Sequence, residues 1–424
     1  MRPIESRAAG LTFSDEVARA TFLKMTPRKW RLVQVFERFL RILVLFVPPR
    51  VAKDPAAAPK RILVLEYWNL GDLAIVVPFL RNLRRAFPGA RISLVVNSGL
   101  ASFLESQELV DEFIPVRAPW AQHFSRWKKY SPFSHQWVSL VGTFLAIRRQ
   151  RFDWALSGRM DLRDNFLLWL TGAPRRIGYG FGGGAFLLTD CIAPDLSRPH
   201  RADVWLHLLQ ALGWTPDRNL NHFRLTNADI SFAKSMLREM GIPADSFLIG
   251  IHPGARMAVR RWGDERFAEV ARYVLAKTGV HVLWFSDPGD PSKAPELDRC
   301  HSVTTEFSAF VALLSRCHLL VCNDSGPMHL ANLLALQVVA VFGPQRPDWF
   351  GPRGKRDRVV IRPEFWCRPC FDYCIFDCPY CLRSISSDEV VASVEEALRE
   401  LRTEGVSEAG RDRGGNWHER VSNV

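Results

Sequence analysis

The sequence predicts an α/β protein with two parallel, doubly wound sheets. Residues 61–66 form a near-continuous apolar run of strand length, residues 73–87 have helical spacing, and residues 91–96 form a second strand-like run. A strand, a helix and a strand in this order make a right-handed parallel crossover, the repeating unit of such sheets. The alternation starts again at residues 247–251, and 424 residues with 47% hydrophobic content suffice for two domains.

A basic segment precedes the first predicted sheet. Residues 1–60 hold 12 Lys and Arg against 5 Asp and Glu, which is 7 of the net charge of +12. Within it, residues 29–47 are predicted to be a helix, and its charges together with the stop at Pro48-Pro49 argue against a membrane span. Two alternatives stay open: an interfacial helix at a lipid surface, or a helix packed on the protein itself. Residues 1–10 do not have the pattern of a secretory signal.

Asp72 is the candidate reactive group of the first domain. It lies in the loop after the first strand, and doubly wound sheets bind ligands at the carboxyl ends of their strands. Asp is also a favoured helix cap and Gly71 eases the turn, so a purely structural role fits the local sequence as well.

Aromatic and cationic side chains alternate in residues 115–151. This alternation suits a surface that binds an anionic sugar or a lipid headgroup, although aromatic stripes more often belong to the hydrophobic core. Arg126 and Lys128 in this region, and Arg163 after the strand predicted at residues 152–157, are the candidate acceptor-binding residues.

The second domain contains a probable phosphate site. An apolar run at residues 318–321 ends in Asp324-Ser325-Gly326-Pro327 and opens a helix predicted over residues 328–336. Backbone N–H groups at such a helix start are unpaired and lie at the positive end of the helix dipole, which favours an anion. His329 lies in the first turn, where it can reach the same anion. An ordinary helix start capped by Asp324 or Ser325 is the alternative.

Other strand ends of this domain carry similar turns. Residues 247–251 are followed by His252-Pro253-Gly254-Ala255-Arg256 and then Arg260 and Arg261, and residues 281–285 are followed by a loop ending in Asp290. Parallel strands bring these turns to one edge of the sheet. A pocket for a nucleotide diphosphate is the natural interpretation.

These residues together resemble glycosyltransferase family 9, the bacterial heptosyltransferases of the lipopolysaccharide inner core. The resemblance runs from about Lys60 to Leu401. The matching segments are residues 62–72, which start with Ile-Leu-Val and end with Leu-Gly-Asp, Pro78, Leu83, Phe87-Pro88, residues 252–255, Arg261-Trp262, Arg266-Phe267 and residues 323–330.

The resemblance implies a GT-B fold, in which two Rossmann-like domains face each other across the active site. The implied divisions are a basic N-terminal extension (1–59), an acceptor-binding domain (60–213), a nucleotide-sugar-binding domain (227–385), a C-terminal helix that crosses back to the first domain (386–402) and a disordered tail (403–424). The implied donor is ADP-heptose, and the implied acceptor is a lipopolysaccharide-core or other membrane-linked glycan. The enzyme is expected in the bacterial cytoplasm, peripheral at the inner membrane through its N-terminal helix, and without nucleic acid as a partner.

The resemblance also implies roles for individual residues. Asp72 corresponds to the general base of an inverting displacement. The implied donor-binding residues are His252, Gly254, Ala255, Arg260, Asp290, Asp324, Ser325, Gly326 and His329. No metal or other cofactor is expected, because cations and helix dipoles can stabilise the leaving diphosphate. The family often has Lys where this chain has Arg260, and residues 159–164 lack the Gln-Gly-Leu pattern of the lipopolysaccharide enzymes, so the acceptor stays open.

The cysteines suggest a weaker alternative, in which the protein binds a zinc ion. Cys367, Cys370, Cys378 and Cys381 form two Cys-x2-Cys pairs that have the ligand types of a tetrahedral zinc site. A sparser cluster in the same loop of relatives has no known metal. Two other functions also stay open: a nucleotide-sugar-binding protein without transferase activity, and a sugar-nucleotide epimerase of the same fold.

Overall fold

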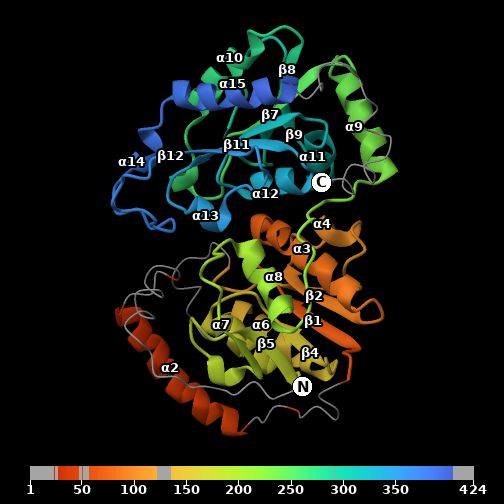
Figure 1. Cartoon of the computed structure of the whole chain (residues 1–424), viewed down its shortest axis with the longest axis vertical. Coiled ribbons are helices and arrows are strands. Elements are labelled where there is room, and N and C mark those ends of the chain that lie inside the picture. The colour runs from red at the N-terminus through yellow and green to blue at the C-terminus, as the bar shows by residue number, and fades with distance from the viewer. Residues whose placement is uncertain are drawn as a thin grey trace.

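The protein consists of two α/β domains, one above the other in Figure 1. The structure, a computed structural model, describes residues 23, 27–46, 50, 57–121, 135–290 and 292–403. Each domain holds a six-stranded sheet, and every strand pair in both sheets is parallel. The predicted pair of doubly wound sheets is therefore confirmed.

The first sheet has the strand order β3-β2-β1-β4-β5-β6. Its strands are β1 (Arg61–Leu65), β2 (Arg91–Asn97), β3 (Glu112–Val116), β4 (Trp154–Leu156), β5 (Arg175–Tyr179) and β6 (Asp190–Ile192). The helices of this domain are α3 (Leu70–Ala86), α4 (Ser102–Glu105), α6 (His135–Arg149), α7 (Leu162–Leu170), the 3-10 turn η1 (Ala185–Leu187) and α8 (Arg201–Ala211). The apolar run from Ile62 to Leu65 is fully buried, as a central strand covered on both faces must be.

The second sheet repeats this order as β12-β11-β10-β7-β8-β9. Its strands are β7 (Phe247–His252), β8 (Val280–Ser286), β9 (Cys300–Thr304), β10 (Leu319–Asn323), β11 (Gln337–Phe342) and β12 (Arg358–Ile361). Its helices are α9 (Asn227–Glu239), the 3-10 turn η2 (Ala258–Arg260), α10 (Asp264–Leu275), α11 (Phe307–Leu314), α12 (Gly326–Leu333), α13 (Pro347–Phe350), α14 (Tyr380–Arg383) and α15 (Ser387–Thr403). In both domains the chain order reverses between the first and the fourth strand, and ligands bind at such switch points.

The two domains touch through α3 and α12. Buried side chains of both helices, such as Leu73 and Met328, belong to one continuous apolar cluster. At the edge of this junction His200 Nε2 lies 3.0 Å from the carbonyl oxygen of Gly351, and Arg353 pairs with Asp203. The switch points of both sheets consequently face each other.

Helix α2 (Pro27–Phe46) runs along the outer side of the first domain (Figure 1). Leu40 is buried in a small cluster with Leu162, Trp169 and Leu187, and Glu37 accepts a hydrogen bond from the backbone N–H of Gly184. One face of this helix is therefore packed on the protein's own surface.

Helix α15 corrects the expectation that the C-terminal helix crosses back to the first domain. It packs against α10, β11 and β12, and its apolar residues Val390, Val394 and Ala397 lie in the core of the second domain. That expectation came from the family resemblance, and the apolar face of the helix is buried in its own domain instead.

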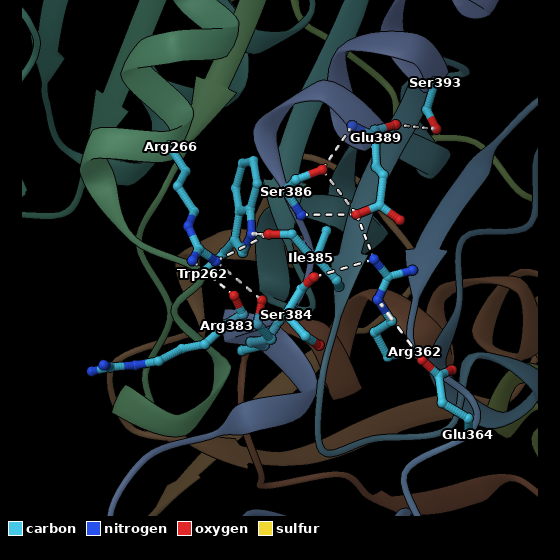
Figure 2. A network of polar contacts seen from close by, with 11 residues as sticks. Trp262, Arg266, Arg362, Glu364, Arg383, Ser384, Ile385, Ser386, Glu389 and Ser393 are labelled. Carbon is cyan, nitrogen blue, oxygen red and sulfur yellow. Dashed lines mark hydrogen bonds and ion pairs between the residues drawn. The ribbon is translucent and has the colours of Figure 1, made fainter.

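The approach to α15 is fixed to the same domain (Figure 2). Trp262 Nε1 donates to the carbonyl oxygen of Ile385 at 3.0 Å, and Arg266 donates to the carbonyls of Ile385 and Arg383. On the other side of this segment, Arg362 Nη2 donates to Glu389 Oε2 in the first turn of α15 at 2.6 Å.

Candidate active site

Asp72 lies in the first turn of α3, at the switch point of the first sheet. Its Oδ2 accepts a hydrogen bond from the backbone N–H of Asn69 at 3.3 Å, and its Oδ1 accepts one from Arg159 Nη2 at 2.6 Å. Burial would raise the pKa of Asp72, but Arg159 and the Asn69 N–H outweigh burial, and the pKa lies below its usual value. Asp72 is therefore ionised at neutral pH.

Arg159 is a site residue that the sequence did not single out. It follows β4, the strand next to β1, so it reaches the same sheet edge as Asp72. Its guanidinium lies 4.6 Å from the centre of the Trp68 ring and also binds Glu66 Oε1 at 3.1 Å. Its place directly after a predicted strand was the one signal in the sequence.

The first turns of α3 and α12 meet across the domain junction. A Cβ on Gly71 would lie 2.9 Å from His329 Cδ2, and a Cβ on Gly326 would lie 3.2 Å from Leu70. Burial, with the neighbouring His200, lowers the pKa of His329 to about 3, so its imidazole is neutral. Two helix N-termini, each with unpaired N–H groups, thus converge on one point.

The phosphate-site residues of the second domain cluster around Arg260. Its guanidinium makes two bonds of 2.6 Å to Asp372, and its Nη1 lies 3.3 Å from Asp324 Oδ2. Burial raises the pKa of Asp324 to about 6, although Arg260 opposes this shift. Ser325 is the residue before α12 and is extended, but its side chain makes no capping hydrogen bond: its hydroxyl donates to the carbonyl oxygen of Asn323. Asp372 comes from the cysteine-rich loop, and no motif in the sequence marks it as a site residue.

The loop after β7 carries the other predicted donor residues. Arg261 binds both oxygens of Asp290 and donates to the carbonyl of Ala255 at 2.9 Å. Asp290 therefore shapes this loop through an ion pair. Gly254 passes close to it, because an added Cβ would lie 3.1 Å from Asp290 Oδ2.

Arg256 in the same loop bridges the domains. Its Nη1 donates to Asn69 Oδ1 at 2.9 Å, and Asn69 directly precedes α3. Part of the loop that carries the predicted donor residues thus touches the segment that positions Asp72.

A pocket of about 200 Å³ opens beside these turns. His252, Asp287, Thr305 and Phe310 help to line it from the second domain, and Leu70 lines it from the first. Within the described part of the chain, His252 Nδ1 and Thr305 Oγ1 are buried there without a hydrogen-bond partner. An apolar pocket with a few buried polar groups suits a nucleoside.

Aromatic rings and arginines line the first domain beside Asp72. Arg163 lies 5.8 Å from the Trp68 ring and 5.4 Å from the Trp120 ring, and it is paired with Asp161. Rings beside cations suit a sugar with anionic groups. Arg126 and Lys128, the other predicted acceptor-binding residues, lie outside the described residues.

The four cysteines of the alternative zinc set are not assembled as a metal site. In the described ranges no three His, Cys, Asp or Glu side chains come together as metal ligands. Cys370 and Cys381 are buried, whereas Cys367 and Cys378 are partly exposed.

Comparison with solved structures gives the class of the protein. The crystal structure of the glycosyl transferase family 9 from Veillonella parvula has a TM-score of 0.66 at 25% identity and covers 80% of this chain and 98% of that chain. E. coli ADP-heptose lps heptosyltransferase II has a TM-score of 0.62 at 20% identity, covering 81% and 99%. Two facing α/β domains with a cleft between their switch points define a GT-B glycosyltransferase.

Sequence comparison gives the family. Residues 143–378 match the description "Glycosyltransferase family 9 (heptosyltransferase)", and the chain belongs to this family. It is 29% identical over 331 residues to lipopolysaccharide heptosyltransferase 2 of Salmonella typhimurium, covering 71% of this chain and 87% of that protein. It is 22% identical to lipopolysaccharide heptosyltransferase 2 of Escherichia coli over the same length. The predicted family, fold and enzyme class are confirmed.

Proposed function

We propose that this enzyme transfers a heptose, or a related sugar, from ADP-heptose to a lipopolysaccharide-core or other membrane-linked glycan, with inversion. The observation that carries the proposal is the position of Asp72. Its carboxylate lies at the start of α3, which meets the start of α12, the helix that carries His329. A base and a leaving-group site on opposite sides of one cleft are what a single displacement needs.

The reaction follows from the charges of the two sides. Asp72 takes the proton of the acceptor hydroxyl as the oxygen attacks the anomeric carbon. The bond to the diphosphate breaks on the opposite face of the sugar. The α12 amides and Arg260 stabilise the charge on the departing diphosphate, so the step needs no metal ion.

The donor proposal rests on the pocket and on the relatives. The pocket beside His252 suits a nucleoside, and the E. coli heptosyltransferase II of similar fold is described as an ADP-heptose enzyme. Trp68, Trp120 and Arg163 form the acceptor side in this proposal, with Arg126 and Lys128 as further acceptor-binding residues.

A donor screen tests the proposal. The full chain is incubated with ADP-, GDP-, UDP- and dTDP-sugars, and its thermal unfolding is followed. ADP-sugars should raise the melting temperature most. Transfer is then measured as release of ADP from ADP-heptose with a lipopolysaccharide-core acceptor. Binding without transfer would indicate a binding protein, and a changed sugar without acceptor would indicate an epimerase.

The proposal places the enzyme at the cytoplasmic face of the inner membrane, bound through α2. The outward face of this helix exposes seven large apolar side chains: Leu32, Val35, Phe36, Phe39, Ile42, Leu45 and Phe46. Its sequence carries five Lys or Arg and one Glu. An apolar stripe flanked by cations suits an anionic lipid surface. Among the described helices, none combines the length and the apolar character that a membrane span requires.

Vesicle sedimentation tests the proposed binding of α2 to a lipid surface. Phe39→Ser with Ile42→Ser should reduce binding of the full chain to phosphatidylglycerol vesicles by about tenfold, because these two apolar side chains no longer enter the lipid. Val138→Ser with Val141→Ser on α6 is the matched control, since these side chains are also exposed. Equal loss in both variants would argue against a role specific to α2.

A further inference from the structure

One nitrogen of Arg159 binds two carboxylates. Its Nη2 lies 2.6 Å from Asp72 Oδ1 and 3.1 Å from Glu66 Oε1. Glu66 follows β1 directly and is only 2% exposed, so the acceptor does not reach it. Nothing in the transfer reaction described above uses this second acid.

Glu66 also fixes the surroundings of Arg159. The same oxygen, Oε1, accepts a hydrogen bond from the backbone N–H of Trp68 at 3.3 Å. The Trp68 ring in turn lies under the Arg159 guanidinium at 4.6 Å. Glu66, Trp68 and Arg159 thus form one unit that holds the guanidinium against Asp72.

The charges of this unit affect Asp72 directly. Glu66, Arg159 and Asp72 together carry one net negative charge when both acids are ionised. Loss of the charge on Glu66 would leave a simple Arg–Asp pair, in which Asp72 holds a proton less well. A weaker base takes the acceptor proton less effectively.

Other charged groups face the unit without replacing Glu66. Arg201 of α8 interacts electrostatically with Arg159, Asp72 and Glu66. From the second domain, His329, Arg256 and Arg260 act on Asp72. Two further acids, Asp161 and Asp164, also interact electrostatically with Arg159. Of the described acids other than Asp72, Glu66 is the one whose carboxylate accepts a hydrogen bond from Arg159.

We propose that Glu66 is a positioning residue that shares Arg159 with Asp72 and thereby keeps Asp72 basic enough to deprotonate the acceptor. This inference rests on the proposed role of Asp72 as the base. It assigns a distinct task to each of two neighbouring carboxylates: Asp72 meets the substrate, and Glu66 acts through the arginine.

The charge on Glu66 depends on pH. Burial raises the pKa of Glu66 to about 7, with Arg159 opposing the shift. As the pH falls through about 7, Glu66 gains a proton and its charge is lost. Asp72 then becomes a weaker base, and turnover falls although Asp72 itself is still ionised.

The test is the pH profile of kcat for the full chain with saturating donor and acceptor. Glu66→Gln should lower kcat about threefold to tenfold above pH 7 and remove the step near pH 7. Burial also raises the pKa of Asp164 to about 7, so Asp164→Asn is the control and should keep the step. Glu66→Asp keeps the charge and should keep the step. The thermal shift produced by ADP should be the same in the wild type and in both Glu66 variants, because Glu66 does not touch the donor site.

Two outcomes overturn the inference. Glu66→Gln with an unchanged step near pH 7, or with the same fractional loss at every pH, would show a purely structural role. If this variant does not fold, Arg159→Lys replaces it: a lysine lacks the planar guanidinium that stacks on Trp68 and holds Nη2 between the two acids, so the step should disappear there as well. Full activity of Asp72→Asn would overturn the base assignment instead, which separates the two failures.

Discussion

The two domains share one topology but place their acid and their arginine in opposite order. In the first domain the carboxylate of Asp72 follows the first strand, β1, and Arg159 follows the fourth, β4. In the second domain Arg260 follows the first strand, β7, and Asp324 follows the fourth, β10. Both pairs lie at the switch point of their sheet.

Asp72 and Asp324 also differ in their exposure and in the direction in which their surroundings shift their pKa. Asp72 keeps 21% of its side chain exposed, and Arg159 lowers its pKa. Asp324 is 2% exposed, and burial raises its pKa to about 6. Arg260 cannot fully offset that burial because Asp372 binds its guanidinium through two bonds of 2.6 Å.

The difference separates two tasks. In the first domain an arginine holds an accessible carboxylate in its ionised form. In the second domain two acids hold an arginine charged beside a helix N-terminus: burial would lower the pKa of Arg260, but Asp324 and Asp372 raise it. The same pair of residue types thus presents a base on one side of the cleft and a cation on the other.

The largest expected effect is a loss of turnover when Asp72, the proposed base of the first domain, is replaced. Asp72→Asn removes the proton acceptor but keeps the shape, so kcat should fall about 10²- to 10⁴-fold while the thermal shift with ADP persists. Asp324→Asn on the other side should change the ADP shift instead, since Asp324 neighbours Arg260. Turnover close to wild type in Asp72→Asn would remove the distinction between the two sides.

A smaller effect is expected on ADP binding when Arg260, the arginine of the second domain, is replaced. Arg260→Gln should weaken ADP binding about 10- to 100-fold, the worth of one charge-assisted hydrogen bond to phosphate. Arg261→Gln is the matched control, because Arg261 binds Asp290 in the same loop. It should weaken binding only a few-fold, as measured by calorimetry. Equal losses would mean that loop shape, and not the charge at Arg260, decides affinity.

The sequence predicted the central strands better than the edges. Residues 61–66 and 247–251 are long apolar runs because strands covered on both faces must be apolar. The sequence did not predict β3, β5, β6, β9 and β12. They are short or carry charged and polar residues, and β3, β6, β9 and β12 are the edge strands of the two sheets. Edge strands need fewer apolar residues, so their pattern is weak.

The site was predictable where one motif contains it. Asp324 to His329 are contiguous, and their strand, turn and helix are recognisable from the sequence. Arg159 is 87 residues from Asp72, and Asp372 is 112 residues from Arg260. Those pairings depend on which strands become neighbours, which residue spacing does not specify. The expectation that α15 crosses back to the first domain was wrong for a different reason: it came from the family resemblance, whereas the helix packs on its own domain.

The smallest expected effect tests the contact between the two sides. A Cβ at Gly71 would lie 2.9 Å from His329 Cδ2, so Gly71→Ala must displace the His329 ring or move α3 away from α12. Such overpacking costs about 1–3 kcal/mol, and the shift should lower kcat/KM roughly tenfold because the base moves away from the donor site. Gly89→Ala is the matched control, since nothing lies within 4 Å of its added Cβ. Melting curves and transfer rates of both variants provide the measurement. If Gly71→Ala retained both wild-type values, the close approach of the two helix starts would have no part in aligning the base with the leaving group.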